Sequence, residues 1–168
     1  MAFRNRRVLS ADDPEYFGEI YTPAPDGDAF RDHRTREKGY AMIAVILHVI
    51  IGFLPAMGLN VAWTAACYAA AMILAILIAL RAYQAPSEAV PLSREQYRRY
   101  VTGFRVLVNV QRLLIMLSVI LDVIFNFAYQ LGVSIWFILQ IALFLLEALS
   151  LQFLFRQQRN VTWEAGTK

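Results

Sequence analysis

The feature that most limits what this chain can fold into is a set of four long apolar runs. They cover residues 40–58, 60–83, 106–129 and 133–155 of the 168-residue chain. A helix needs about 20 predominantly apolar residues to cross the hydrocarbon core of a bilayer. Each run is close to that length, and the hydrophobic fraction of 58% lies above the range of soluble domains. The pattern predicts an all-α, polytopic membrane protein whose four transmembrane helices form two antiparallel hairpins.

The remaining sequence divides the chain into three regions. Residues 1–38 are polar and are predicted to form an N-terminal tail, and residues 160–168 a short C-terminal tail. Residues 39–159 form the transmembrane domain, and the connections within it are too short to hold a separate catalytic domain. Residues 94–103 are predicted to form an interfacial helix before the third run.

The basic residues predict the orientation of the chain in the membrane. Of the 16 Lys and Arg residues, all except Arg112 lie in residues 1–38, between residues 81 and 105, or after residue 155. Connections on the cytoplasmic side carry an excess of Lys and Arg. We therefore expect both termini and the middle connection in the cytoplasm, with the bacterial plasma membrane as the location. The net charge of +3 then reflects topology, and no nucleic-acid partner is expected.

Two segments outside the runs are candidate contact surfaces for lipid or for a partner protein. A short amphipathic helix in the N-terminal tail would begin at Ser10 or Asp12 and carry aromatic and aliphatic side chains on one face. The capping-box spacing of Ser93 and Gln96 begins the interfacial helix. The candidate contact residues are Tyr16, Phe17, Ile20, Tyr21, Arg94, Arg98 and Arg99. Two alternatives remain: the aromatic segment rests on the protein's own cytoplasmic side, and the arginines only determine topology.

The third and fourth runs contain a set of polar residues that we call the polar seam. It consists of Asn109, Arg112, Asp122, Asn126, Gln140 and Glu147. A charged side chain at the centre of a membrane helix costs roughly 2.5–3.5 kcal/mol even on the insertion scale. In an antiparallel hairpin Arg112 and Glu147 lie at the same depth, so we predict an ion pair between them. Asp122 and Gln140 are predicted to form a hydrogen bond nearer the outer side.

His48 is the one polar residue near the middle of the first run. It is a candidate proton site, and the alternative is a packed, hydrogen-bonded histidine. Ala44 and Gly52 fall on the same helical face, where small side chains allow a neighbouring helix to approach closely.

These residues support two functional hypotheses. The first is a non-enzymatic integral membrane subunit or scaffold that assembles with itself or with other membrane proteins through the polar seam. The alternative is a small channel or proton- or ion-coupled transporter that uses Asp122, Glu147 and Arg112, because ionisable residues within the membrane are functional candidates by default. The single cysteine, Cys67, and the lack of HExxH, nucleophile-elbow and phosphate-loop motifs predict no enzyme activity, metal or cofactor.

Overall fold

Four long helices form most of the protein. The computed structural model describes residue 11 and residues 16–24, 27–55 and 62–167, and it is 76% helical. The long helices are α1 (Gly27–Gly52), α2 (Ala62–Gln84), α4 (Gly103–Ala128) and α5 (Ile135–Asn160). The short elements are β1 (Glu19–Pro23), β2 (Leu92–Ser93), α3 (Arg94–Tyr97), the π-helical turn η2 (Arg98–Thr102) and β3 (Trp163–Thr167).

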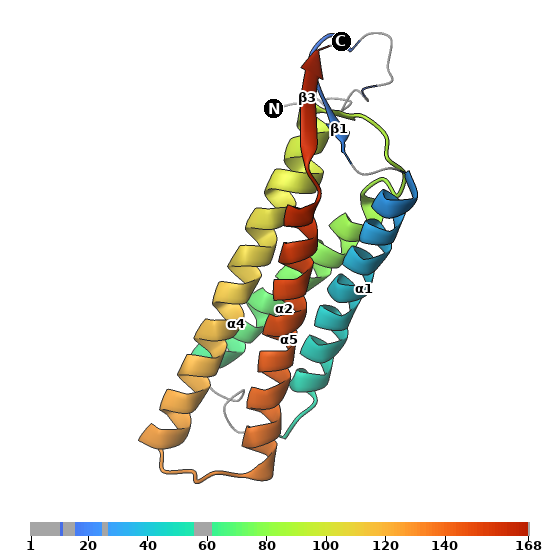
Figure 1. Cartoon of the computed structure of the whole chain (residues 1–168). Coiled ribbons are helices and arrows are strands. Elements are labelled where there is room, and N and C mark those ends of the chain that lie inside the picture. Colours follow the sequence, from blue (N-terminus) through green and yellow to red (C-terminus); the bar gives the residue numbers. More distant parts are fainter. Residues whose placement is uncertain (1–10, 12–15, 25–26, 56–61, 168) are drawn as a thin grey trace, which may run out of the picture.

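The long helices lie side by side in one elongated body (Figure 1). Helix α1 packs against α2 and α5, and α4 packs against the same two neighbours. The core between them combines small side chains, such as Ala41 and Ala82, with large ones, such as Phe104 and Phe144. Small residues on α1 and α2 therefore leave room for the bulkier residues of α4 and α5.

Three helices are long and apolar enough to cross a membrane: α2, the continuous helix Arg94–Ala128, and α5. Many of their large apolar side chains face outward, among them Ile73 and Leu113. Soluble proteins rarely expose apolar surface on this scale. The helices confirm the prediction of a helical membrane protein. Helix α1 is not among these three in the described part of the chain, because its first half carries several charges and residues 56–61 lie outside that part.

The side chains that face the interior recur every three or four residues along each long helix. On α1 they are Phe30, Arg34, Glu37, Ala41, Ala44, His48 and Ile51. On α4 they are Phe104, Val108, Gln111, Ile115, Ser118 and Asp122. An average spacing of 3.5 residues is the pattern of helices that pack at a shallow angle over a long distance. Polar residues occupy several of these interior positions, and this determines where the candidate site forms.

The N-terminal region differs from the predicted polar tail. Helix α1 begins at Gly27 and not near residue 39. Arg34 and Glu37 occupy interior positions that apolar residues hold elsewhere on the helix. Both are buried, and they form an ion pair of 2.6 Å with each other. Burial raises the pKa of Glu37, and the neighbouring Arg34 opposes this shift.

A three-stranded antiparallel sheet joins three distant parts of the chain. The strand order is β2-β1-β3, and Ile20 lies opposite both Ser93 and Gly166. The sheet lies at the end of the molecule where α1 begins and α5 ends (Figure 1). It therefore ties the two terminal regions to the connection between α2 and α4.

This sheet corrects two predictions. Ile20 and Tyr21, expected on a short helix, lie in β1, and residues 160–168, expected as a tail, contain β3. A short isolated helix is marginal, whereas β1 gains hydrogen bonds to two strands and a stacked contact of 4.1 Å between the Tyr21 and Tyr97 rings. The predicted helix caps, Ser10 and Asp12, lie outside the described residues.

Candidate functional site

A buried histidine–glutamate pair lies at the centre of the four long helices. His48 Nδ1 of α1 is 2.9 Å from Glu147 Oε2 and 3.0 Å from Glu147 Oε1 of α5. Both side chains are 0% exposed. His48 Nε2 is 3.0 Å from the backbone carbonyl oxygen of Tyr68 on α2. A carbonyl oxygen only accepts hydrogen bonds, so Nε2 carries a proton.

A hydrogen bond between Nδ1 and the carboxyl group then requires one further proton, on either His48 or Glu147. If His48 Nδ1 is also protonated, it donates to an ionised Glu147. If Nδ1 is unprotonated, a neutral Glu147 donates to it. Both arrangements satisfy the contact, and the two groups together hold one proton between nitrogen and oxygen. This arrangement links α1 to α5 through a buried polar contact.

Two more helices complete what we call the His–Glu cluster: His48, Tyr68, Gln111 and Glu147. Gln111 Nε2 of α4 donates to Glu147 Oε1 at 3.2 Å. The Tyr68 ring stacks on His48 at a centroid distance of 4.3 Å, and its hydroxyl donates to the His48 carbonyl oxygen at 2.7 Å. A Cβ at Gly52 would collide with the Tyr68 hydroxyl, so this close approach requires glycine.

The predicted Arg112–Glu147 ion pair is wrong. Arg112 is half-buried at the side of α4, and its guanidinium lies 5.9 Å from the centroid of the Phe155 ring. Equal depth in a hairpin fixes the axial level of two residues but not the direction in which they point. The interior stripe of α4 passes through Gln111, so Gln111 meets Glu147 and its neighbour Arg112 points elsewhere.

The predicted hydrogen bond between Asp122 and Gln140 is also not formed. Both side chains are buried, at 2% and 0% exposure. Within the described part of the chain, both Asp122 carboxyl oxygens and both polar atoms of the Gln140 amide lack a hydrogen-bond partner. Buried polar groups normally have one, so these two side chains are exceptions to that rule.

The rest of the polar seam lies at the surface. Arg112 and the exposed Asn109 line an open groove of about 710 Å³ between α4 and α5, which we call the outer groove. Its other lining residues are Leu113, Met116, Leu145, Ala148, Leu149 and Gln152. Gln152 Oε1 is buried there without a partner among the described residues. Asn126 is half-buried near the end of α4 and belongs neither to the cluster nor to the groove.

The candidate contact residues outside the membrane runs lie beside the sheet. The Tyr16 hydroxyl accepts a hydrogen bond from the Arg94 backbone at 3.1 Å. Arg94 forms an exposed ion pair of 3.6 Å with Glu19. Phe17 is 85% exposed, and Arg98 and Arg99 lie on η2. The predicted capping box between Ser93 and Gln96 is present at the start of α3.

Sequence reasoning missed the partners that bring the site together. Gln111 belongs to the same interior stripe as Ser118 and Asp122, which are seven and eleven residues further on. That spacing is visible in the sequence and points to an interior position. The contribution of Tyr68 has no such signal, because its contacts with His48 depend on how α1 and α2 pack.

These features define a helical integral membrane protein with a buried histidine–glutamate cluster between its long helices. Comparisons with protein-family models, with curated proteins and with solved structures find no match to the chain. Among the described residues, no group of three or more His, Cys, Asp and Glu side chains is arranged to hold a metal ion.

Proposed function

We propose that the protein is a non-enzymatic integral membrane subunit that assembles with another membrane protein through the outer groove. The assembly function is the one expected from the polar seam. The contact surface, however, is the outer groove with Arg112 and Asn109 and not the whole seam. Glu147, Asp122 and Gln140 are buried between the helices, where they act on the protein's own packing. Arg112 and Asn109 remain available to a partner.

Arg112 carries the proposal. The ion pairs of the described residues are Arg34–Glu37, His48–Glu147 and Arg94–Glu19, and none includes Arg112. The ring of Phe155 at 5.9 Å offers a cation–π contact but no negative charge. A guanidinium beside lipid-facing leucines is costly, and a carboxylate from a neighbouring membrane helix would lower that cost.

The partner that fits is a different membrane protein with an acidic residue in a membrane helix. A second copy of this chain is a poorer match, because the carboxylates of α4 and α5, Asp122 and Glu147, are both buried inside the molecule. The amides of Asn109 and Gln152 give the partner helix additional hydrogen-bonding positions in the groove. Polar contacts of this kind hold membrane helices together where hydrophobicity gives no preference.

The proposal includes four membrane spans with both termini in the cytoplasm of a bacterium. The proposed first span, residues 40–58, overlaps the second half of α1 from Tyr40 to Gly52, and its residues 56–58 lie outside the described part of the chain. An even number of spans is consistent with a sheet that contains both terminal regions. The basic residues outside the spans lie in residues 1–38, between residues 81 and 105, and after residue 155. The positive-inside rule assigns these regions to the cytoplasmic side.

Photo-crosslinking in native membranes tests the assembly. A photoreactive phenylalanine analogue replaces Leu149 in the groove or, as the control, the exposed Ile73 on α2. We expect a crosslinked adduct from position 149 only, and Arg112→Leu should lower its yield about tenfold, the loss expected for a charge-assisted hydrogen bond. Arg156→Leu, an exposed arginine on α5, should leave the yield unchanged. Equal adducts from both positions, or an adduct indifferent to Arg112→Leu, would refute the proposal.

A proton-coupled channel or transporter is the second candidate. Its supporting observation is the buried contact of His48 with Glu147 together with a further buried carboxyl, Asp122, that lacks a partner among the described residues. Liposomes containing the purified protein and a pH-sensitive dye separate the two functions. A subunit that only assembles gives no proton flux, whereas a proton carrier gives a flux that Glu147→Gln abolishes.

A further inference from the structure

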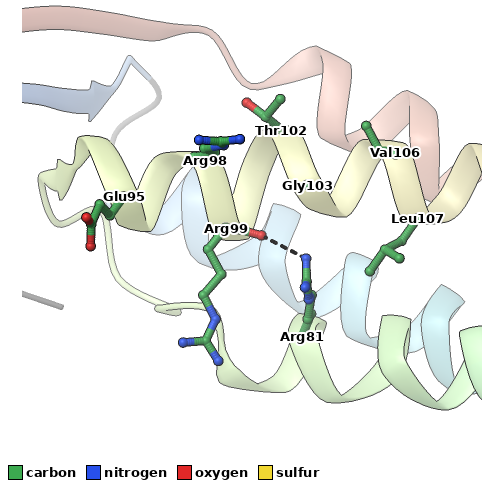
Figure 2. A pocket seen from close by; sticks show the side chains of 8 residues that line it. All are labelled: Arg81, Glu95, Arg98, Arg99, Thr102, Gly103, Val106 and Leu107. Carbon is green, nitrogen blue, oxygen red and sulfur yellow. Dashed lines mark hydrogen bonds between the residues drawn. The ribbon is translucent and has the colours of Figure 1, made fainter. Parts of the chain in front are cut away.

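A second pocket lies between the end of α2, the π-helical turn η2 and the start of α4 (Figure 2). It has a volume of about 700 Å³, and we call it the arginine pocket. It is lined by Arg81, Glu95, Arg98, Arg99, Thr102, Gly103, Val106 and Leu107. Three cations and one carboxylate thus share a space that the proposed assembly surface does not include.

The three arginines have only weak neutral partners in the described part of the chain. Arg81 Nη1 donates to the backbone oxygen of Arg99 at 3.5 Å, the contact dashed in Figure 2, and Arg99 Nη2 donates to Gln84 Oε1 at 3.4 Å. The Arg98 side chain makes neither a hydrogen bond nor an ion pair with described residues. Glu95 projects away from Arg81 in Figure 2 and forms no ion pair with the arginines. The pocket therefore has uncompensated positive charge.

The local backbone allows Arg81 to reach across to η2. The Gly103 N–H donates to the Arg98 carbonyl oxygen, which closes a π turn. Such turns are rare within helices, and those that occur are often found at functional sites. A Cβ at position 103 would lie 3.0 Å from the Arg98 oxygen and 3.1 Å from Arg81 Nη1. Glycine at this position keeps the space between the two helices open.

The pocket changes from charged to apolar along its length. Glu95 lies nearest the sheet, and Arg98 and Arg99 follow about one turn later (Figure 2). Gly103 comes next, with Arg81 beside it, and Val106 and Leu107 follow after another turn. Val106 is 57% exposed. In a bilayer the arginines would stand at the headgroup level, with the two aliphatic side chains beside the first carbons of an acyl chain. A phospholipid has this same order of charge and apolar chain.

We infer that the arginine pocket binds the headgroup of an anionic phospholipid. The phosphate lies between Arg81 and Arg99, with Arg98 adding positive charge, and the acyl chain leaves along Val106 and Leu107. Guanidinium groups bind phosphate oxygens through paired N–H donors, which makes arginine better suited than lysine to this role. The inference depends on the membrane location of the chain and is independent of the proposed assembly at Arg112.

Native mass spectrometry of the full chain in mild detergent tests this site. The protein is titrated with phosphatidylglycerol or with phosphatidylcholine of the same acyl chains. We expect tighter binding of phosphatidylglycerol, weakened about tenfold by Arg81→Gln with Arg99→Gln, since a charge-assisted hydrogen bond contributes about 1.5–3 kcal/mol. The control, Arg156→Gln with Arg159→Gln, removes the same charge from exposed positions on α5 and should change binding less than about twofold.

Arg98→Gln guards against a pair of substitutions that fails to fold, because the Arg98 side chain makes no hydrogen bond or ion pair with described residues. It should weaken phosphatidylglycerol binding by itself. Equal binding of the two lipids, or equal weakening in the α5 control, would overturn the inference, as would displacement of the lipid by a soluble polyglutamate peptide. Arg112→Leu should leave lipid binding unchanged, so failure of this site and failure of the assembly proposal are distinguishable.

Discussion

Glu147 is held by side chains from two other helices, His48 of α1 and Gln111 of α4. Its side chain is fully buried, so a lost partner cannot be replaced by water. The free energy of these contacts is therefore best judged from the cost of removing one partner. Removing one partner of a buried ion pair costs about 3–5 kcal/mol in soluble proteins. Hydrogen bonds between membrane helices contribute about 0.6 kcal/mol on average. We expect the cost of removing His48 to lie nearer the higher value, because its loss leaves the buried Glu147 carboxyl without its ion-pair partner.

A double-mutant cycle measures this coupling at the residue scale. We expect His48→Leu alone to lower the free energy of unfolding by about 3 kcal/mol, because Glu147 loses its main partner. His48→Leu combined with Glu147→Leu should cost clearly less than the sum of the two single changes. Unfolding by SDS in mixed micelles provides the measurement.

The matched control cycle combines Arg112→Leu with Glu147→Leu. These residues belong to different sites, so their effects should add within about 0.5 kcal/mol. Coupling between Arg112 and Glu147, or additivity between His48 and Glu147, would contradict the contacts described above.

The elements show which parts of the fold a sequence can predict. The apolar runs correctly predicted helices at α2, α4 and α5, because length and hydropathy alone decide them. The first half of α1 was missed because Arg34 and Glu37 read as a solvated tail, although they lie on the same interior stripe as Ala41 and His48. Only the mutual pairing of two buried charges makes that stripe recognisable, and pairing depends on tertiary structure.

The same limit applies to the candidate site. The sequence identified His48, Glu147 and Asp122 as residues that need a structural or functional reason to be in the membrane. It could not assign their partners, because depth along a helix can be read from spacing but the direction of a side chain depends on how helices pack. Strand β1 is a similar case, since its partners lie about 70 and 145 residues away along the chain and strand pairing depends on such distant contacts.

Removing β3 tests the sheet as an element. A chain that ends at Asn160 lacks β3, one of the two strands paired with β1, and the contacts of Trp163 with Phe30 at 6.0 Å and Tyr97 at 5.6 Å. The remaining β1–β2 pairing is very short, and isolated two-stranded pairings are marginal. We expect several-fold faster cleavage after Glu19 by a glutamate-specific protease, with the helical circular dichroism retained.

A chain that lacks only residue 168 is the control for this truncation and should be cleaved at the rate of the full chain. If the chain that ends at Asn160 resists the protease equally well, β3 does not hold β1 in place. A loss of helical signal would instead show that the sheet is required for the helices to pack.

At the scale of the whole molecule, the sheet, the buried Arg34–Glu37 pair and the arginine pocket all lie toward one end. The His–Glu cluster lies between the long helices. Sheet strands leave backbone groups at their edges, and these require water or protein as partners. The sheet therefore belongs outside the hydrocarbon, with the arginine pocket beside it at the headgroup level. The connection between α4 and α5 lies at the opposite end of the long axis (Figure 1). One end of the molecule therefore carries the sheet and the other carries this connection.

This arrangement predicts which connections face each side of the membrane. In a Cys67→Ser background, single cysteines at the exposed positions Glu88→Cys and Thr167→Cys mark the sheet end, and Val133→Cys marks the opposite end. A membrane-impermeant maleimide should label positions 88 and 167 from the cytoplasmic face of inside-out vesicles, and position 133 only in right-side-out vesicles. Labelling of positions 88 and 133 from the same side would exclude an α2–α4–α5 arrangement that crosses the membrane. Labelling with the two sides exchanged would retain the spans and reverse the orientation, which would place the arginine pocket on the non-cytoplasmic side of the membrane.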